Sequence, residues 1–144
     1  MAYKWTPANV CGPFPKNMVE GGQDSDCSTI FVGRASYNGD LLPAKVIPEK
    51  NAAYVAHGGD EVLVRCFEVL CRKELIWERS CGGCIPQGAV AGGKTSDGEP
   101  LYVGRGCHDG ALTVGKVHRS HGCLYIPYGG AEVSLKSYEV LCER

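Results

Sequence analysis

The feature that most constrains this chain is an internal repeat. When the 144-residue sequence is shifted by 71 positions, residues 14–71 align with residues 85–142 without a gap, and 22 of the 58 aligned positions are identical. The identities fall in blocks, for example Val32-Gly33-Arg34 against Val103-Gly104-Arg105. Two copies are too few for a solenoid, which needs about three. The repeat therefore predicts one compact pseudo-twofold pair in which each copy covers the apolar face of the other.

The local patterns indicate β structure. Residues 30–37 and 40–46 are strand-like and flank Asn38-Gly39, and the second copy has Asp109-Gly110 at the matching place. Such pairs favour a two-residue type I′ turn, because both turn positions need a positive φ. The sequence therefore predicts a β-hairpin at the same place in each copy.

The end of each copy also looks like a strand. Residues 61–70 and 132–141 alternate in polarity and are rich in Val and aromatic side chains, so we expect one strand in each. Helical periodicity is weak, and its one candidate, residues 72–79, is better interpreted as the link into the first strand of the second copy. With 20 Gly and 8 Pro, which favour tight turns, the chain is predicted to be all-β.

Composition narrows the function. The 15 Lys+Arg nearly balance the 16 Asp+Glu, which gives no general attraction to nucleic acid or to an acidic membrane. No apolar run approaches the roughly 20 residues that span a bilayer, and we expect no membrane insertion. The N-terminus lacks the apolar region of a signal peptide, so a cytoplasmic location and secretion by a route without a signal both stay open. The nine cysteines are an odd number, and their pairing is left open.

The hairpin register suggests which side chains are available for binding. With a turn at Asn38-Gly39, Val32 faces Lys45 and Arg34 faces Pro43. Alternation then places Arg34 and Lys45 on a polar face, where we expect the Lys45 ammonium to be accessible. The other face carries the side chains expected in the core, Phe31, Ala35, Tyr37, Leu42, Ala44 and Val46. The second copy repeats the polar face with Arg105 and Lys116.

Several acids recur beside these cations, namely Asp26/Asp97, Glu61/Glu132 and Glu68/Glu139. Two interpretations stay open for them, because a recurring acid–base pair either fixes the fold or binds a ligand. The glycines at 21, 22, 58 and 59 are interpreted as turn formers. No histidine aligns with a histidine of the other copy, and Cys81-x-x-Cys84 lies too far from His118-x-x-His121 for a zinc finger. We therefore expect no catalytic residue, no metal ion and no cofactor.

The blocks together resemble the DM9 repeat. They combine a Val-Gly-Arg strand, an Asn-Gly or Asp-Gly turn, a Lys-Val strand, a Tyr before Gly-Gly-x-Glu-Val and a closing Tyr/Phe-Glu-Val-Leu. The tandem arrangement is similar to the mannose-binding DM9 lectins of bivalves, and the same repeat occurs in the lectin part of natterin-like toxins. The resemblance implies two intertwined antiparallel repeats, here residues 5–71 and 77–142, in one compact unit that forms a homodimer.

The resemblance also implies a site. It points to an Asp–Lys pair that binds mannose, which places the site at Lys45 with Asp24 as the first choice of acid and Asp26 as the second. The second copy keeps Lys116 and Asp97, but Thr95 stands opposite Asp24. Arg34 and Arg105 are added as further candidates. A carboxylate and an ammonium can together hold two neighbouring hydroxyls through charge-assisted bonds.

These observations favour a metal-independent lectin that recognises mannose and mannose-terminated glycans, as in innate immunity, rather than an enzyme. Two alternatives stay open. One is a glycoside hydrolase, which needs two positioned carboxyl groups. The other is a cytosolic protein-interaction module in which the paired repeat is purely structural.

Overall fold

The computed structural model describes residues 3–72 and 74–144. Met1, Ala2 and Lys73, which belong to the N-terminus and the link discussed above, lie outside the described residues. Two short 3-10 turns are η1 (Pro48–Lys50) and η2 (Arg119–His121). The strands in the described residues are β1 (Lys4–Asn9), β2 (Glu20–Gln23), β3 (Thr29–Tyr37), β4 (Asp40–Ile47), β5 (Ala52–His57), β6 (Asp60–Leu63), β7 (Cys66–Cys71), β8 (Leu75–Cys81), β9 (Ala91–Lys94), β10 (Pro100–His108), β11 (Ala111–His118), β12 (Cys123–Tyr128), β13 (Ala131–Leu135) and β14 (Ser137–Glu143). The chain is thus all-β, as predicted. Within the described residues, no helix has the length and apolar character needed to cross a bilayer.

Both predicted hairpins are present with the expected register. Val32 pairs with Lys45 and Arg34 with Pro43 in β3–β4, and β10–β11 pairs in the same way. Asn38 has a φ of 51°, and the following Gly39 has a φ of 87°. Positive values at both central positions are what a type I′ turn requires. Of residues 72–79, which we expected to be a link, residues 75–79 already belong to β8, so the first strand of the second repeat begins earlier than expected.

The expected single strand at the end of each copy is wrong. Residues 61–70 divide into β6, which pairs with β5, and β7, which pairs with β1 and β3. The second copy divides in the same way, into β13 and β14. Polarity alternates through both halves because each is a half-buried strand. Alternation therefore cannot reveal that the chain leaves one partner strand at Val64 and joins another at Cys66.

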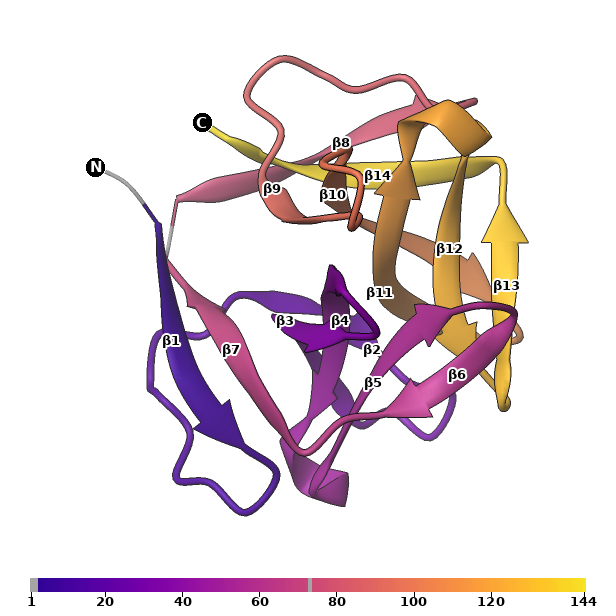
Figure 1. The fold of residues 1–144 in the computed structure, drawn as a ribbon. Helices are drawn as coiled ribbons and strands as arrows, with labels where there is room; N and C mark the ends of the chain where they lie inside the picture. Colours follow the sequence, from indigo (N-terminus) through magenta and orange to yellow (C-terminus); the bar gives the residue numbers. More distant parts are fainter. Residues whose placement is uncertain (1–2, 73) are drawn as a thin grey trace.

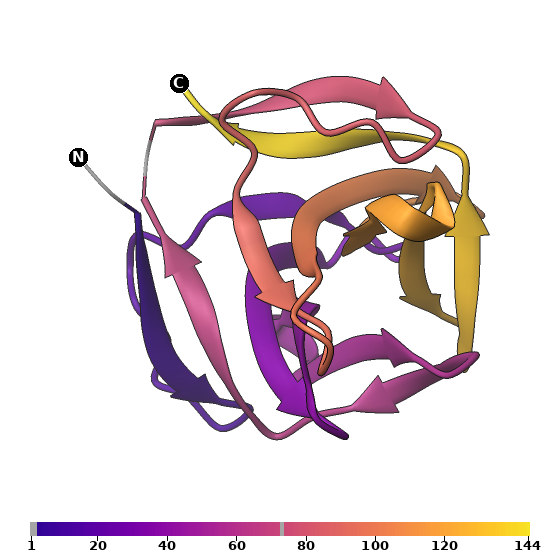
Figure 2. The same cartoon turned by 45° about the horizontal axis from the view of Figure 1, so that its top comes forward.

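The two repeats are intertwined. All strands of the described residues belong to one antiparallel sheet, which folds back on itself through the pairings β3–β4 and β10–β11. Strands also pair across the repeats at three places, β2 with β11, β4 with β9 and β6 with β13. Figure 1 shows the β5–β6 hairpin of repeat 1 reaching β12 and β13 of repeat 2, and Figure 2 shows β4 and β9 side by side.

The core explains why the repeats fold together. One cluster joins buried side chains of both copies, including Ile30 and Val32 from repeat 1 and Val103 and Val114 from repeat 2. The face of β3–β4 that we expected to be polar therefore lies against the other repeat, and Val32 is completely buried there. Tyr37, which we expected in the core, is instead 39% exposed at the end of its strand.

All nine cysteines are free thiols. Seven of them are exposed or half-buried, whereas Cys123 and Cys142 are buried. Burial raises the pKa of the Cys142 thiol to about 12, with a contribution from Glu78. A thiol with so high a pKa is almost entirely protonated at neutral pH and is a poor nucleophile. Cys142 therefore acts as a small apolar core residue.

The backbones of β4 and β9 approach each other closely, and a substitution at this contact tests the fold. Gly93 of β9 lies against the carbonyl of Leu41, so that a Cβ at this position would overlap the Leu41 oxygen. Gly93→Ala should lower the free energy of unfolding by about 1–3 kcal/mol, as expected for overpacking. Urea unfolding should show this loss, whereas Ser96→Ala, an exposed control in the following loop, should stay within about 0.5 kcal/mol of the parent. Equal stability of the two variants would contradict the β4–β9 contact.

Candidate functional site

Lys45 is buried, which overturns the expectation that its ammonium is accessible. Its side chain is only 4% exposed. Strand β4 places it opposite Tyr54 of β5, and strand β12 of repeat 2 covers it from the other side. The register prediction was right, but the face on which Lys45 lies is covered by the second repeat.

The Lys45 ammonium contacts a carboxylate, a backbone carbonyl and two aromatic rings. It lies 2.9 Å from Glu61 Oε2 and donates a hydrogen bond of 2.6 Å to the carbonyl of Pro127. The rings of Tyr54 and Tyr128 lie 5.3 and 5.4 Å from Nζ, within the range of a cation–π interaction. Two of these partners, Pro127 and Tyr128, belong to β12 of repeat 2. Both repeats therefore hold this lysine.

The glutamates recur for a structural reason. Glu61 Oε1 accepts a hydrogen bond of 2.9 Å from the backbone N–H of Gly130, at the β12–β13 turn of repeat 2. Glu132 does the same for Gly59, at the β5–β6 turn of repeat 1. Lys116 lies 3.0 Å from Glu132 Oε2 but is not aligned as a hydrogen bond, so this contact is an ion pair alone. Each lysine–glutamate pair therefore ties its own repeat to a turn of the other.

Asp24 and Asp26 are held by a lysine that the sequence analysis did not select. The Lys50 ammonium lies 2.8 Å from Asp24 Oδ2 and 3.0 Å from Asp26 Oδ2. Burial alone would raise the pKa of Asp24, but bonds from Lys50 and from the Ser25 N–H outweigh it and lower that pKa. Hydrogen bonds from Ser28, and then from Lys50, lower the pKa of Asp26 to about 2. Both acids are therefore ionised at neutral pH. Lys50 was not predicted from the sequence, because it does not recur: His121 stands at its place in the second copy.

The predicted Asp24–Lys45 pair is not in direct contact, but both residues line one cavity. This cavity, called here the repeat-1 pocket, has a volume of about 240 Å³. Its lining residues are Asp24, Lys45, Ile47, Lys50, Tyr54, Glu61, Tyr128 and Gly129. Carboxylates, ammonium groups and two aromatic rings thus converge on one space that both repeats enclose.

The matching positions in repeat 2 keep only part of this set. Lys116, Tyr125 and Glu132 recur, and Lys116 lies 5.5 Å from the Tyr125 ring centre. The remaining positions change chemistry, with Thr95 for Asp24, His118 for Ile47, His121 for Lys50 and His57 for Tyr128. Asp97, at the position of Asp26, is exposed.

Neither Arg34 nor Arg105 lines the repeat-1 pocket. Each donates a 2.7 Å hydrogen bond to a glutamate, Arg34 to Glu68 and Arg105 to Glu139. The guanidinium groups also lie over the rings of Trp5 and Trp77, at 4.3 and 4.2 Å. Arg105 borders a larger surface hollow, of about 850 Å³, but its charge is already paired with Glu139. Both arginines fix β3 and β10 against their neighbouring strands.

Burial of Lys45 changes the expected effect of removing it. Lys45→Ala leaves the Glu61 carboxylate without its cation in a largely dry site, and breaking such a pair costs about 3–5 kcal/mol. Urea unfolding should show a loss of this size, whereas Lys94→Ala, at an exposed lysine of β9, should change stability by about 0.5 kcal/mol or less. A Lys45→Ala variant as stable as the parent would show that the pair does not tie the repeats together.

Comparison with known proteins agrees with this architecture. In a search of solved structures, the nematode sperm cell motility protein MFP2B matches with a TM-score of 0.75 over 99% of this chain and 47% of the MFP2B chain. At 15% identity this match shows a shared fold alone.

Sequence comparison shows the family. Natterin-4 of Thalassophryne nattereri is 27% identical over 137 residues, which cover 90% of this chain and 32% of natterin-4. Natterin-1 of the same fish is 37% identical over 67 residues, which cover 46% of this chain and 17% of natterin-1. The matched segments thus cover less than a third of the length of either natterin. The model of the DM9 repeat matches residues 24–135, and the chain belongs to the DM9 repeat family.

Proposed function

We propose that this DM9-repeat protein is a metal-independent carbohydrate-binding protein that holds a mannose-type terminal sugar in the repeat-1 pocket. The observation that carries the proposal is the convergence of fixed charges and aromatic rings on one small cavity. Its volume of about 240 Å³ is large enough for part of a single sugar ring. Membership of the DM9 family and the similarity to natterins support a carbohydrate-binding role.

The polar groups of the pocket suit a pair of sugar hydroxyls. Asp24 is ionised and offers acceptor oxygens, and Lys50 restrains its orientation. The Lys45 ammonium has three donors, of which the hydrogen bond to Pro127 uses one, while Glu61 lies beside it as an ion-pair partner. A further N–H of Lys45 would donate to a hydroxyl oxygen of the sugar. Bonds to charged groups are the strong ones in such a site, so Asp24 and Lys45 together can select the positions of two neighbouring hydroxyls.

The aromatic rings suit the rest of the sugar. Tyr54 and Tyr128 are half-buried on the two sides of Lys45. Aromatic surfaces pack well against the apolar C–H face of a pyranose, while the ring hydroxyls stay available for hydrogen bonds. Because Tyr128 belongs to repeat 2, the sugar would bind to both repeats at once.

Lys50 supports the view that no metal ion is needed. In metal-dependent sites, carboxylates such as Asp24 and Asp26 coordinate a cation. Here the Lys50 ammonium lies between these two carboxylates and neutralises part of their charge. The protein thus supplies the positive charge from its own chain.

The same groups favour a binding protein over a glycoside hydrolase. A hydrolase needs a general acid, a carboxyl group whose pKa is raised so that it keeps a proton at working pH. The pKa of Asp24 is lowered, so this carboxyl group does not keep a proton at neutral pH. The other carboxylate of the pocket, Glu61, is already engaged by Lys45 and by the N–H of Gly130.

We also propose a homodimer. One site with a few polar contacts binds a sugar weakly, whereas two sites on one dimer raise the avidity for a glycan-coated surface, as in recognition of microbes. Strands β1 and β8 end the hydrogen-bonded strand order and are candidate edges for pairing. Sedimentation at tens of micromolar protein should give the mass of a dimer. A monomer would contradict this part of the proposal.

Substitution of Asp24 tests the proposed site. Asp24→Asn keeps the shape of the side chain but removes the charge, and loss of a charge-assisted bond costs about 1.5–3 kcal/mol. Titration with methyl α-mannoside should therefore show affinity weakened roughly tenfold or more. Glu78→Gln, at an exposed carboxylate of β8, should bind like the parent, and a chelator should change nothing. Full mannoside binding by Asp24→Asn would place the site elsewhere, and binding abolished by the chelator would contradict metal independence.

A further inference from the structure

A second cavity, called here the junction pocket, lies where the two repeats meet. It has a volume of about 400 Å³, within the range of roughly 300–1,000 Å³ that ligand pockets occupy. Both repeats and the segment between them contribute to its lining, which consists of Lys16, Asn17, Met18, Val19, Glu20, Arg72, Leu75, Trp77 and Leu141. None of these residues lines the repeat-1 pocket. The junction pocket is therefore a separate place at which a ligand can bind.

Arg72 brings an unused hydrogen-bond donor to the junction pocket. Its side chain is only 15% exposed. Among the residues that the structure describes, the buried Nη1 atom of Arg72 has no hydrogen-bond acceptor. Its ion-pair partner, the Glu143 carboxylate, lies 3.9 Å away, which is too far for a hydrogen bond. A buried donor without an acceptor is costly, and a ligand that carries an acceptor removes this cost.

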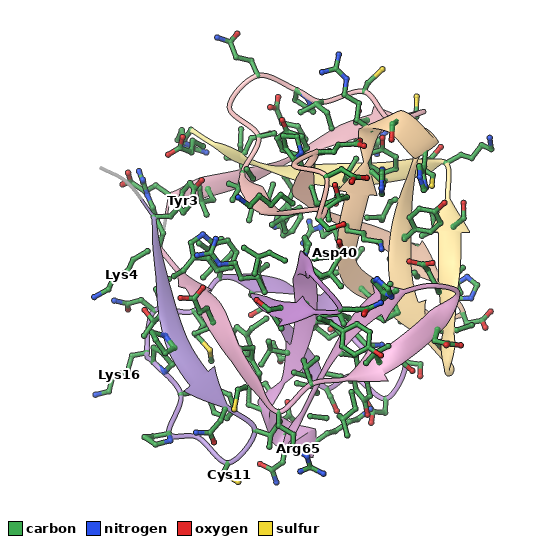
Figure 3. All side chains as sticks on the ribbon, viewed as in Figure 1. Tyr3, Lys4, Cys11, Lys16, Asp40 and Arg65 are labelled. Carbon is green, nitrogen blue, oxygen red and sulfur yellow. The ribbon has the colours of Figure 1, made fainter. Side chains whose placement is uncertain are left out.

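The charges around Arg72 favour a neutral ligand. The lining holds two cations, Lys16 and Arg72, and one acid, Glu20. Glu143, beside Arg72, adds a second acid. These charges balance, so an anionic ligand gains no net attraction. Figure 3 shows the exposed Lys16 side chain pointing outward, which leaves Arg72 as the cation that the cavity encloses.

Apolar side chains supply much of the remaining lining. Met18, Leu75 and Trp77 are half-buried at the junction pocket. The Arg105 guanidinium lies 4.2 Å from the centre of the Trp77 ring and holds the indole in place. A ligand hydroxyl beside these side chains would need an acceptor for its own proton, whereas a carbonyl oxygen only accepts. The junction pocket therefore suits a carbonyl group that carries a methyl group.

We propose that the junction pocket binds an N-acetylated amino sugar through its acetamido group. This inference rests on the proposed carbohydrate-binding function and adds a second ligand class to it. Arg72 turns its unused N–H toward the acetamido oxygen, and the acetamido methyl packs against Trp77 and Leu75. The hydroxyls of the sugar ring lie at the rim, where the exposed Glu20 carboxylate accepts a hydrogen bond from one of them.

The other repeat provides an internal control. Trp5 occupies the place in repeat 1 that Trp77 occupies in repeat 2. Glu143 stands at the place of Arg72. An ionised carboxylate cannot donate a hydrogen bond to a carbonyl oxygen, so the acetamido group should not bind beside Trp5.

NMR titration of the full chain tests the proposal, because its two tryptophans and two methionines give few indole and methyl signals to assign. The probes are methyl N-acetyl-β-glucosaminide and methyl N-acetyl-β-galactosaminide. Methyl β-glucoside, which has a hydroxyl in place of the acetamido group, is the matched control, and acetamide measures binding of the bare group. Arg72→Met removes the donor, and Arg65→Met, at an exposed arginine, is the control variant. Thermal unfolding checks that each variant remains folded.

At least one of the two N-acetyl sugars should shift the Trp77 indole and Met18 methyl signals of the parent, while the Trp5 indole signal stays unchanged. Methyl β-glucoside and acetamide should bind there roughly tenfold or more weakly, as expected for loss of a hydrogen bond to a charged donor and of the ring contacts. Arg72→Met should lose a similar share of its affinity for the N-acetyl sugar and keep mannoside binding. Arg65→Met should bind both sugars like the parent.

Mannoside binding without a Trp77 response to either N-acetyl sugar would overturn the inference alone. Acetamide binding equal to that of the sugars, or full N-acetyl sugar binding by a folded Arg72→Met, would also overturn it. The parent titration needs no variant, so the test holds even if Arg72→Met fails to fold. Absence of mannoside binding would instead count against the proposed mannose site in the repeat-1 pocket.

Discussion

Two reciprocal contacts hold the architecture together. Glu61 binds the N–H of Gly130, and Glu132 binds the N–H of Gly59, so each repeat reaches across to a turn of the other. A buried carboxylate needs a countercharge, which Lys45 supplies to Glu61 and Lys116 supplies to Glu132. These residues thus join the repeats, and Lys45 and Glu61 also line the repeat-1 pocket. The structural and the ligand-binding interpretations of the recurring acids and bases are not exclusive.

The two repeats differ in sequence around the lysine–glutamate pairs that join them. The lysine, the glutamate and one tyrosine recur at the matching places of both repeats, where the lysine–glutamate pair joins one repeat to the other. The residues around them differ, and Asp24 and Lys50 of repeat 1 are replaced by Thr95 and His121 in repeat 2. At an exposed position such as His121, a substitution usually alters stability by about 0.5 kcal/mol or less. One fold therefore carries two different sets of polar side chains at matching places.

The sequence predicts what depends on neighbouring residues and on the repeat. Asn38-Gly39 determines a turn type and therefore a register, and the 71-residue offset indicates a pseudo-twofold pair. Contacts between distant segments are not encoded in such local patterns. Lys45 looks solvent-exposed by alternation, yet β12 of repeat 2 covers it. Lys50 escaped notice because its counterpart is a histidine, so a search for recurring residues finds the shared joint and misses the residues that differ.

Amide and side-chain NMR shifts of the full chain, followed during titration with methyl α-mannoside, show whether a sugar binds in the pocket that both repeats build. We expect the changes to concentrate at Asp24, Lys50 and Tyr54 of repeat 1 and at Tyr128 of repeat 2, four residues that line one cavity. Changes centred on the hollow beside Arg105, or confined to one repeat with Tyr128 unaffected, would contradict this expectation.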